Sequence, residues 1–146
     1  MSRLILLAIV LILSACSGPR YVTPADGSTP EQIQLVYQAA HAWNAVSGEV
    51  LGVDVFVVAE GDVAVSFGWS SVQLGGAYGS AQIGGDKVWL ASDAPDPLGV
   101  LTHELGHILG LTDRGWATEE DDGLMTWGGS YQFTELDKMA LKSVQY

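Results

Sequence analysis

Two histidines and a glutamate stand close together in the second half of the chain, as His103, Glu104 and His107. Residues four apart lie one turn apart on the same face of an α-helix, so both imidazoles can bind a single metal ion. Glu104 lies beside them and can take a proton from a metal-bound water as a general base. The segment therefore predicts a zinc site with hydrolytic chemistry.

The residues that follow extend this pattern to His-Glu-x-x-His-x-x-Gly-x-x-Asp, with Gly110 and Asp113 at its end. A glycine just past a helix can take a positive φ and turn the chain back sharply. We expect Asp113 to reach the metal from the other side, as the third protein ligand beside His103 and His107. A fourth position then stays open for water, whose pKa zinc lowers to about 7.

The extended motif resembles that of the metzincin metallopeptidases, whose third ligand is usually a histidine. Some metzincins, notably the snapalysin-type bacterial enzymes, carry aspartate there, as this chain does at Asp113. Residues 123–127 resemble the Met-turn of the family, which implies that Met125 packs beneath the imidazoles without binding metal; ordinary core packing would also explain it. The resemblance implies a matrixin-like or snapalysin-like zinc metalloendopeptidase.

The resemblance also implies how peptide bonds would be hydrolysed. Glu104 takes a proton from the attacking water and delivers it to the leaving amine, while the metal stabilises the oxyanion. Some metzincins place a tyrosine two residues after the methionine; Trp127 stands there, and Tyr131 is a weaker candidate for that role. An extended substrate would pair antiparallel with an edge strand within residues 76–84, although a plain glycine-rich hairpin explains that segment equally well.

The elements that must position these residues follow from hydrophobic periodicity and from turn and cap residues. Thr29 and Asp96 are predicted to cap two of the helices. The expected order is a helix over residues 30–46, strands over residues 50–59, 62–69, 77–83 and 87–91, a helix over residues 97–109, a loop over residues 112–129 and a closing helix over residues 134–144. This order predicts an α+β fold, and the resemblance implies a mixed, twisted sheet.

The N-terminal residues predict an address rather than part of the fold. Arg3 precedes an unbroken apolar run over residues 4–13, which is too short to span a membrane and has the length of a signal-peptide core. Residues 13–16 resemble the lipobox of bacterial lipoproteins, which implies removal of residues 1–15 and lipidation of Cys16. An ordinary signal peptide or an uncleaved anchor is the alternative.

This resemblance implies a protein anchored by lipid in the bacterial cell envelope. Ser17 follows the cysteine, and the absence of an aspartate there favours the outer membrane where the host has one. Residues 16–29 are rich in proline, glycine and small polar residues, which predicts a flexible tether. The catalytic domain is then expected over residues 30–146.

Composition limits the other functions. The chain has 146 residues, a net charge of −11 and one cysteine. One domain is expected, a nucleic-acid partner is disfavoured by the lack of basic residues, and disulfides or a cysteine-based zinc site are excluded. We expect a monomer that acts on a peptide or protein substrate. The alternative is an inactive metzincin-like lipoprotein that serves as a binding or structural module, against which the intact Glu104 argues.

Three further groups of polar residues receive no catalytic role. His41 is expected to be structural on the first helix. The acidic run over residues 119–122 could bind calcium, but such a run is more often a solvated loop. Thr102 and Ser130 have no histidine free to activate them, which disfavours serine-type catalysis.

Overall fold

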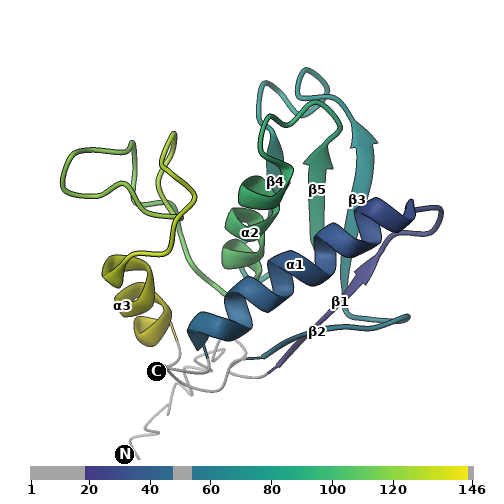
Figure 1. The fold of residues 1–146 in the computed structure, drawn as a ribbon, viewed down its shortest axis with the longest axis horizontal. Coiled ribbons are helices and arrows are strands. Elements are labelled where there is room, and N and C mark those ends of the chain that lie inside the picture. Colours follow the sequence, from purple (N-terminus) through teal and green to yellow (C-terminus); the bar gives the residue numbers. More distant parts are fainter. Residues whose placement is uncertain (1–18, 48–53, 145–146) are drawn as a thin grey trace, which may run out of the picture.

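Five strands and three helices make up the part of the chain that this computed structural model describes, residues 19–47 and 54–144 (Figure 1). The strands pair in the order β2-β1-β3-β5-β4, with every neighbouring pair parallel except β4 and β5. The mixed sheet and the helices confirm the predicted α+β class. The elements are β1 (Arg20–Pro24), α1 (Pro30–Ser47), β2 (Val55–Val57), β3 (Val63–Trp69), β4 (Gly79–Ala81), β5 (Lys87–Ala91), α2 (Pro97–Ile108) and α3 (Glu135–Ser143).

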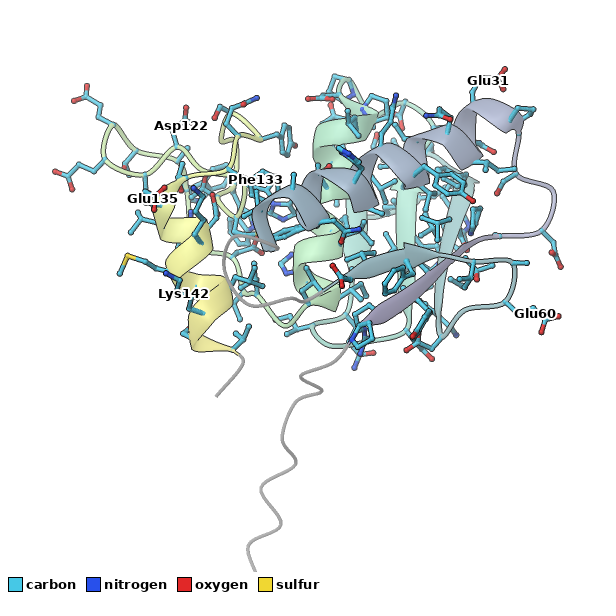
Figure 2. All side chains as sticks on the ribbon, turned by 60° about the horizontal axis from the view of Figure 1, so that its bottom comes forward. Glu31, Glu60, Asp122, Phe133, Glu135 and Lys142 are labelled. Atoms are coloured by element: carbon cyan, nitrogen blue, oxygen red, sulfur yellow. The ribbon has the colours of Figure 1, made fainter. Side chains whose placement is uncertain are left out.

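The two long helices cover one face of the sheet, and α3 stands beside them at one end (Figure 1). α1 packs on α2, β1 and β2, while α2 packs on β4 and β5. Alternation along each strand decides which side chains face the helices: Val63 and Val65 are buried, and Ala64 between them is exposed. Charged side chains such as Glu31, Glu60 and Glu135 project from the periphery (Figure 2).

The tether expected over residues 16–29 is wrong for residues 20–24, which form β1. This strand lies between β2 and β3, and its Val22 has no exposed surface. Pro19 and Pro24 flank a short run of residues that favour strands, and these prolines led to the prediction of a tether. Proline is tolerated at the ends of a strand, where its missing N–H is not needed for pairing. The folded domain therefore includes Arg20, well before the expected start at residue 30.

The remaining elements follow the prediction closely, with shorter strands. The strands expected over residues 62–69 and 87–91 are β3, which begins one residue later at Val63, and β5. Of the expected strand over residues 77–83 only Gly79–Ala81 is paired. In the expected strand over residues 50–59, β2 takes up Val55–Val57, and residues 50–53 lie outside the described ranges. Thr29 caps α1 by the predicted reciprocal bonds with Gln32.

The predicted signal peptide, lipobox and Cys16 also lie outside the described residues. Within the described ranges, no helix is both long enough and apolar enough to cross a membrane.

Close packing in the core joins α1, α2 and the loop before α3. Trp43 of α1 has no exposed surface, donates its indole N–H to the carbonyl of Thr102 at 2.7 Å, and meets the ring of Phe133 edge-on. Gly106 of α2 lies between Trp43 and Met125, where a methyl group would come within 2.9 Å and 2.5 Å of these side chains. The absence of a side chain at Gly106 therefore lets the helix seat on both.

Gly106→Ala is expected to destabilise the protein by about 1–3 kcal/mol, because the added methyl overpacks this contact. Helix propensity alone would make the same substitution stabilising by about 1 kcal/mol. Urea denaturation of the two proteins checks the sign. A higher free energy of unfolding for the variant would contradict the packing described here.

Candidate metal centre

The site is built on α2, which starts as the sequence predicts. The Asp96 side chain accepts a hydrogen bond from the backbone N–H of Gly99 at 3.0 Å, and Pro97 occupies the first turn. Two turns further on, His103, Glu104 and His107 are all less than a tenth exposed. Burial of three polar side chains on one helix is costly unless they are bonded, so their partners define the site.

The exit from α2 carries the chain back toward the histidines. Gly110 has φ +97, its N–H bonds the carbonyl of His107, and the N–H of Leu111 bonds the carbonyl of Gly106. This pair of bonds is a Schellman motif, which needs a left-handed residue at its glycine position. The predicted turn at Gly110 is confirmed, and it brings Asp113 to the two imidazoles.

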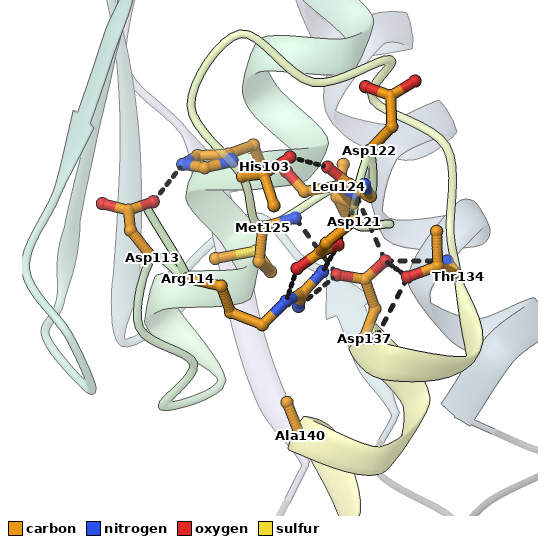
Figure 3. Close-up of polar contacts among 12 residues, drawn as sticks. His103, Asp113, Arg114, Asp121, Asp122, Leu124, Met125, Thr134, Asp137 and Ala140 are labelled. Atoms are coloured by element: carbon orange, nitrogen blue, oxygen red, sulfur yellow. Dashed lines mark hydrogen bonds and ion pairs between the residues drawn. The ribbon is translucent and has the colours of Figure 1, made fainter. Parts of the chain in front are cut away.

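Three ligand atoms converge at this point. The Oδ1 atom of Asp113 lies 3.1 Å from Nε2 of His103 and 3.6 Å from Nε2 of His107 (Figure 3 shows the first contact). One side-chain ligand atom from each residue lies within 4.8 Å of the other two. The structure thus brings together the three ligands that the sequence predicted.

Both imidazoles have a fixed tautomer. Nδ1 of His103 lies 2.7 Å from the carbonyl oxygen of Leu124, and Nδ1 of His107 lies 2.8 Å from that of Leu111. Because a carbonyl only accepts, each Nδ1 carries the proton, and in the neutral ring Nε2 is left with a lone pair. Each Nε2 lone pair is therefore available for a metal, and a backbone carbonyl fixes the orientation of each ring.

The Asp113 oxygen between them has no donor. Burial lowers the pKa of His103 below its usual value, so its ring is neutral at pH 7 and the close approach to Asp113 is not an ion pair. Oδ1 of Asp113 is buried and has no hydrogen-bond partner among the described residues. A carboxylate oxygen and two imidazole lone pairs that face one another are compatible with a bound metal ion.

Glu104 lies beside this group under unusual electrostatic conditions. Burial, and to a smaller extent the charge of Asp113, raise the pKa of Glu104 to about 8 in the metal-free protein. The edge strand β4 approaches the carboxyl closely: a methyl group on Gly79 would lie 2.6 Å from its Oε1 atom. Gly79 therefore permits a contact that was not foreseen from the sequence.

Met125 is buried in a turn that packs against α2. Its side chain has no exposed surface. It lies against Gly106, which is the residue before His107 on α2. The preceding carbonyl, of Leu124, is the one that holds His103. Core packing and the Met-turn interpretation predict the same burial for Met125, but the bond to His103 ties this turn to the metal group.

Two residues that support this turn were missed from the sequence. Asp137 has no exposed surface and accepts hydrogen bonds from the backbone N–H groups of Leu124 and Met125, at 3.2 and 3.1 Å. Arg114, which directly follows Asp113, donates to Asp137 at 2.7 Å. Arg114 is the sole arginine after residue 20, and it directly follows a predicted metal ligand. This position could have marked it as a residue that supports the site.

A cleft of about 600 Å³ opens over the three ligand atoms and Glu104. It is lined by β4, by the residues before β4 and by two tryptophans. The rings of Trp116 and Trp127 meet edge-on with centroids 5.5 Å apart, and both are exposed. No lysine or arginine lies among the residues that line the cleft: Gly76, Ala77, Tyr78, Gly79, Ser80, Ala81, Val100, His103, Glu104, His107, Asp113, Trp116, Thr126, Trp127, Gly128 and Tyr131.

Tyr131 lines this cleft and has a strained backbone conformation. It is the one non-glycine residue with a positive φ (54°) in the described ranges, and its ring lies edge-on to that of His103 at 6.4 Å. Burial raises the pKa of its phenol, and the charges of Asp96 and Glu104 act in the same direction. The phenol is therefore a donor at neutral pH, which fits the role that the sequence offered it.

Other candidates lie apart from the metal group. His41 is exposed on α1. The acidic run over residues 119–122 forms no metal-binding group among the described residues; instead Asp121 accepts two bonds from Arg114, which lower its pKa.

No protein-family model matches the sequence, and no curated protein sequence matches it.

The high pKa of Glu104 makes the stability of the metal-free protein depend on pH. In the unfolded chain Glu104 ionises near pH 4.5, but in the folded protein it stays protonated up to about pH 8. Raising the pH between these values therefore favours unfolding, and Glu104→Gln, which cannot ionise, escapes this loss. The melting temperature of the variant is expected to rise relative to wild type from pH 4.5 to pH 8.

Thermal unfolding of both proteins in the presence of a chelator, across this pH range, checks the expectation. The comparison cancels the titration of every group that does not interact with Glu104. A difference that does not change with pH would show that the burial of Glu104 does not penalise its charge.

Proposed function

We propose that this protein is a zinc-dependent metalloendopeptidase of the metzincin type. One observation carries the proposal: two imidazole lone pairs and an unpartnered carboxylate oxygen converge beside the buried carboxyl of Glu104. The resemblance of the motif over residues 103–113 to that of the metzincins supports the choice of family. The α+β fold, with this motif on a helix packed against a mixed sheet, is compatible with it.

The donor set fits zinc. Two neutral histidines and a carboxylate leave a fourth position open, as in catalytic rather than structural zinc sites. When bound, zinc supplies Lewis acidity to a water and to the carbonyl oxygen of the substrate. His103, His107 and Asp113 would hold it, and the carbonyls of Leu124 and Leu111 fix the two imidazole rings.

Proton transfer falls to Glu104. Its carboxyl faces the same cleft as the ligand atoms, and the positive charge of a bound ion would return it to the ionised form that burial disfavours. As a carboxylate it accepts a proton from the attacking water and then passes that proton to the leaving amine. Tyr131 is available to donate a hydrogen bond to the reacting carbonyl oxygen.

The walls of the cleft suit an extended peptide. β4 is the edge strand of the sheet and pairs only with β5 among the described strands, so its outer edge offers backbone groups to a further strand. The lining also includes the apolar rings of Trp116 and Trp127. With no lysine or arginine to bind a terminal carboxylate, the cleft favours cleavage within a chain over removal of a C-terminal residue.

We also propose that the enzyme is anchored in the bacterial envelope. This rests on the resemblance of residues 13–16 to a lipobox, with the single cysteine of the chain at the position that is lipidated. The domain would then act at the membrane surface as a monomer, and in a host with two membranes at the outer one.

Metal analysis is the first test. A protein that starts at Gly18, purified and supplied with zinc, is expected to hold one zinc ion per chain by mass spectrometry. Asp113→Ala is expected to weaken zinc binding markedly, because it removes one of three protein ligands. An exposed acid on α3, Glu135, provides the matched control as Glu135→Ala. Absence of zinc from the reconstituted wild-type protein would overturn the proposed function.

Peptide hydrolysis is the second test, with Glu104→Ala as the variant. Wild type is expected to cleave members of a mixed peptide library, and the variant to lose at least about 100-fold in kcat, the usual contribution of a general base. Its zinc content and fold are expected to remain. A zinc-loaded wild type that cleaves nothing would instead favour the inactive binding module, and unchanged turnover in the variant would refute the role of Glu104.

A further inference from the structure

Arg114 directly follows the third ligand, yet its side chain turns away from the metal group. While Asp113 points toward the histidines, the guanidinium of Arg114 reaches into a group of acidic side chains between the loop and α3 (Figure 3). Its backbone N–H bonds the carbonyl of Met125 at 2.9 Å. Main chain and side chain of this one residue therefore bind two different parts of the C-terminal region.

The guanidinium of Arg114 joins two carboxylates, those of Asp121 and Asp137. Nε and Nη2 donate to the two oxygens of Asp121 at 2.7 and 2.9 Å, and Nη1 donates to Asp137 at 2.7 Å. The first pair of bonds is the planar, two-pronged contact that an ammonium group cannot make. The side chains of Arg114 and Asp121 are each one fifth exposed, so solvent screens this contact only in part.

Asp137 carries the connection on to the metal ligands. Its Oδ1 atom receives both Arg114 and the N–H of Met125, and its Oδ2 atom receives the N–H of Leu124. The carbonyl of Leu124 in turn accepts the Nδ1 proton of His103. A continuous series of bonds therefore runs from Arg114 through Asp137 and the turn to the first ligand, while the backbone joins Arg114 directly to the third.

Removing the guanidinium would take away the positive charge that Asp121 and Asp137 share. Asp137 has no exposed surface and Asp121 lies within reach of the same cation, so removing Arg114 leaves a buried carboxylate without a counter-charge. Loss of one partner from such a pair is strongly destabilising, because the remaining charge stays desolvated. The turn that orients His103 and the segment that presents Asp113 would then be free to move relative to each other.

We propose that Arg114 is a positioning residue for the metal centre, which sets the affinity of the site for its ion without touching it. The guanidinium fixes the distance between the Asp113 segment and the turn that holds His103. This inference rests on the proposed metal centre, and it adds a coupling between the ion and the C-terminal helix. Because coupling is reciprocal, a bound ion stabilises the docking of α3 as much as Arg114 strengthens the binding of the ion.

The experiment compares wild type with Arg114→Gln and Arg114→Lys. The first variant removes the charge, and the second keeps the charge without the two-pronged contact. Lys138→Gln is the matched control, because Lys138 forms an ion pair with Glu135 on the exposed side of α3. For each protein the dissociation constant for zinc is measured by competition with a chelator, and the visible spectrum of the cobalt-substituted form is recorded.

Both Arg114 variants are expected to bind zinc about 10- to 100-fold more weakly, the usual effect of losing an outer-shell partner. The cobalt spectrum is expected to change, because it reports the geometry of the ligands. The rise in melting temperature on adding zinc is expected to shrink. In Lys138→Gln all three readouts should match wild type.

A purely structural role predicts a different result. Arg114→Lys would then lower the melting temperature of the metal-free protein but leave the zinc affinity and the cobalt spectrum as in wild type, which would overturn the inference. If Arg114→Gln does not fold, Arg114→Lys decides. A wild-type protein that binds neither zinc nor cobalt would refute the metal centre itself, and is thereby distinguished from a failure of this inference alone.

Discussion

The arrangement of the site depends on one buried carboxylate, that of Asp137. It forms the capping box at the start of α3 with Thr134 and pairs with Arg114. It also accepts hydrogen bonds from the backbone N–H groups of Leu124 and Met125. A carboxylate without exposed surface persists only where its lone pairs are filled, and here donors come from three separate segments. The same bonds that satisfy Asp137 therefore fix how the loop after α2 and the closing helix sit against the histidines.

Helix geometry explains why the centre of the site could be predicted. His103 and His107 lie four residues apart on one helix, so their spacing alone determines that they face one way, with Glu104 beside His103. The glycine at position 110 carries its own conformational requirement. The α+β class and the caps at Thr29 and Asp96 likewise depend on local signals. β1 was missed because its pairing with β2 and β3 is made by residues more than thirty positions away, and no local pattern reports such a contact.

Close approach, rather than side-chain chemistry, accounts for other features that the sequence concealed. Gly79 lets the edge strand reach Glu104, Gly99 admits the ring of Tyr131 against the start of α2, and Gly106 seats the helix on Met125. In each case the absence of a side chain allows the close contact. The sequence pattern does not distinguish such a glycine from any other. The positive φ of Tyr131 adds strain of the kind that folded proteins keep where a side chain must point into a site.

The balance of charge at the site argues that a cation belongs to the native state. Asp113 and Glu104 are the only ionisable carboxyl groups that line the described cleft, and neither is paired with a lysine or arginine there. Burial holds Glu104 protonated, while Oδ1 of Asp113 stays without a donor; both are costs that a divalent ion would remove at once. By contrast, the two carboxylates of Asp121 and Asp137 both pair with Arg114, which offsets one of their two negative charges. Arg114 thus pairs with carboxylates that support the site, whereas the carboxyl groups inside the cleft have no lysine or arginine beside them.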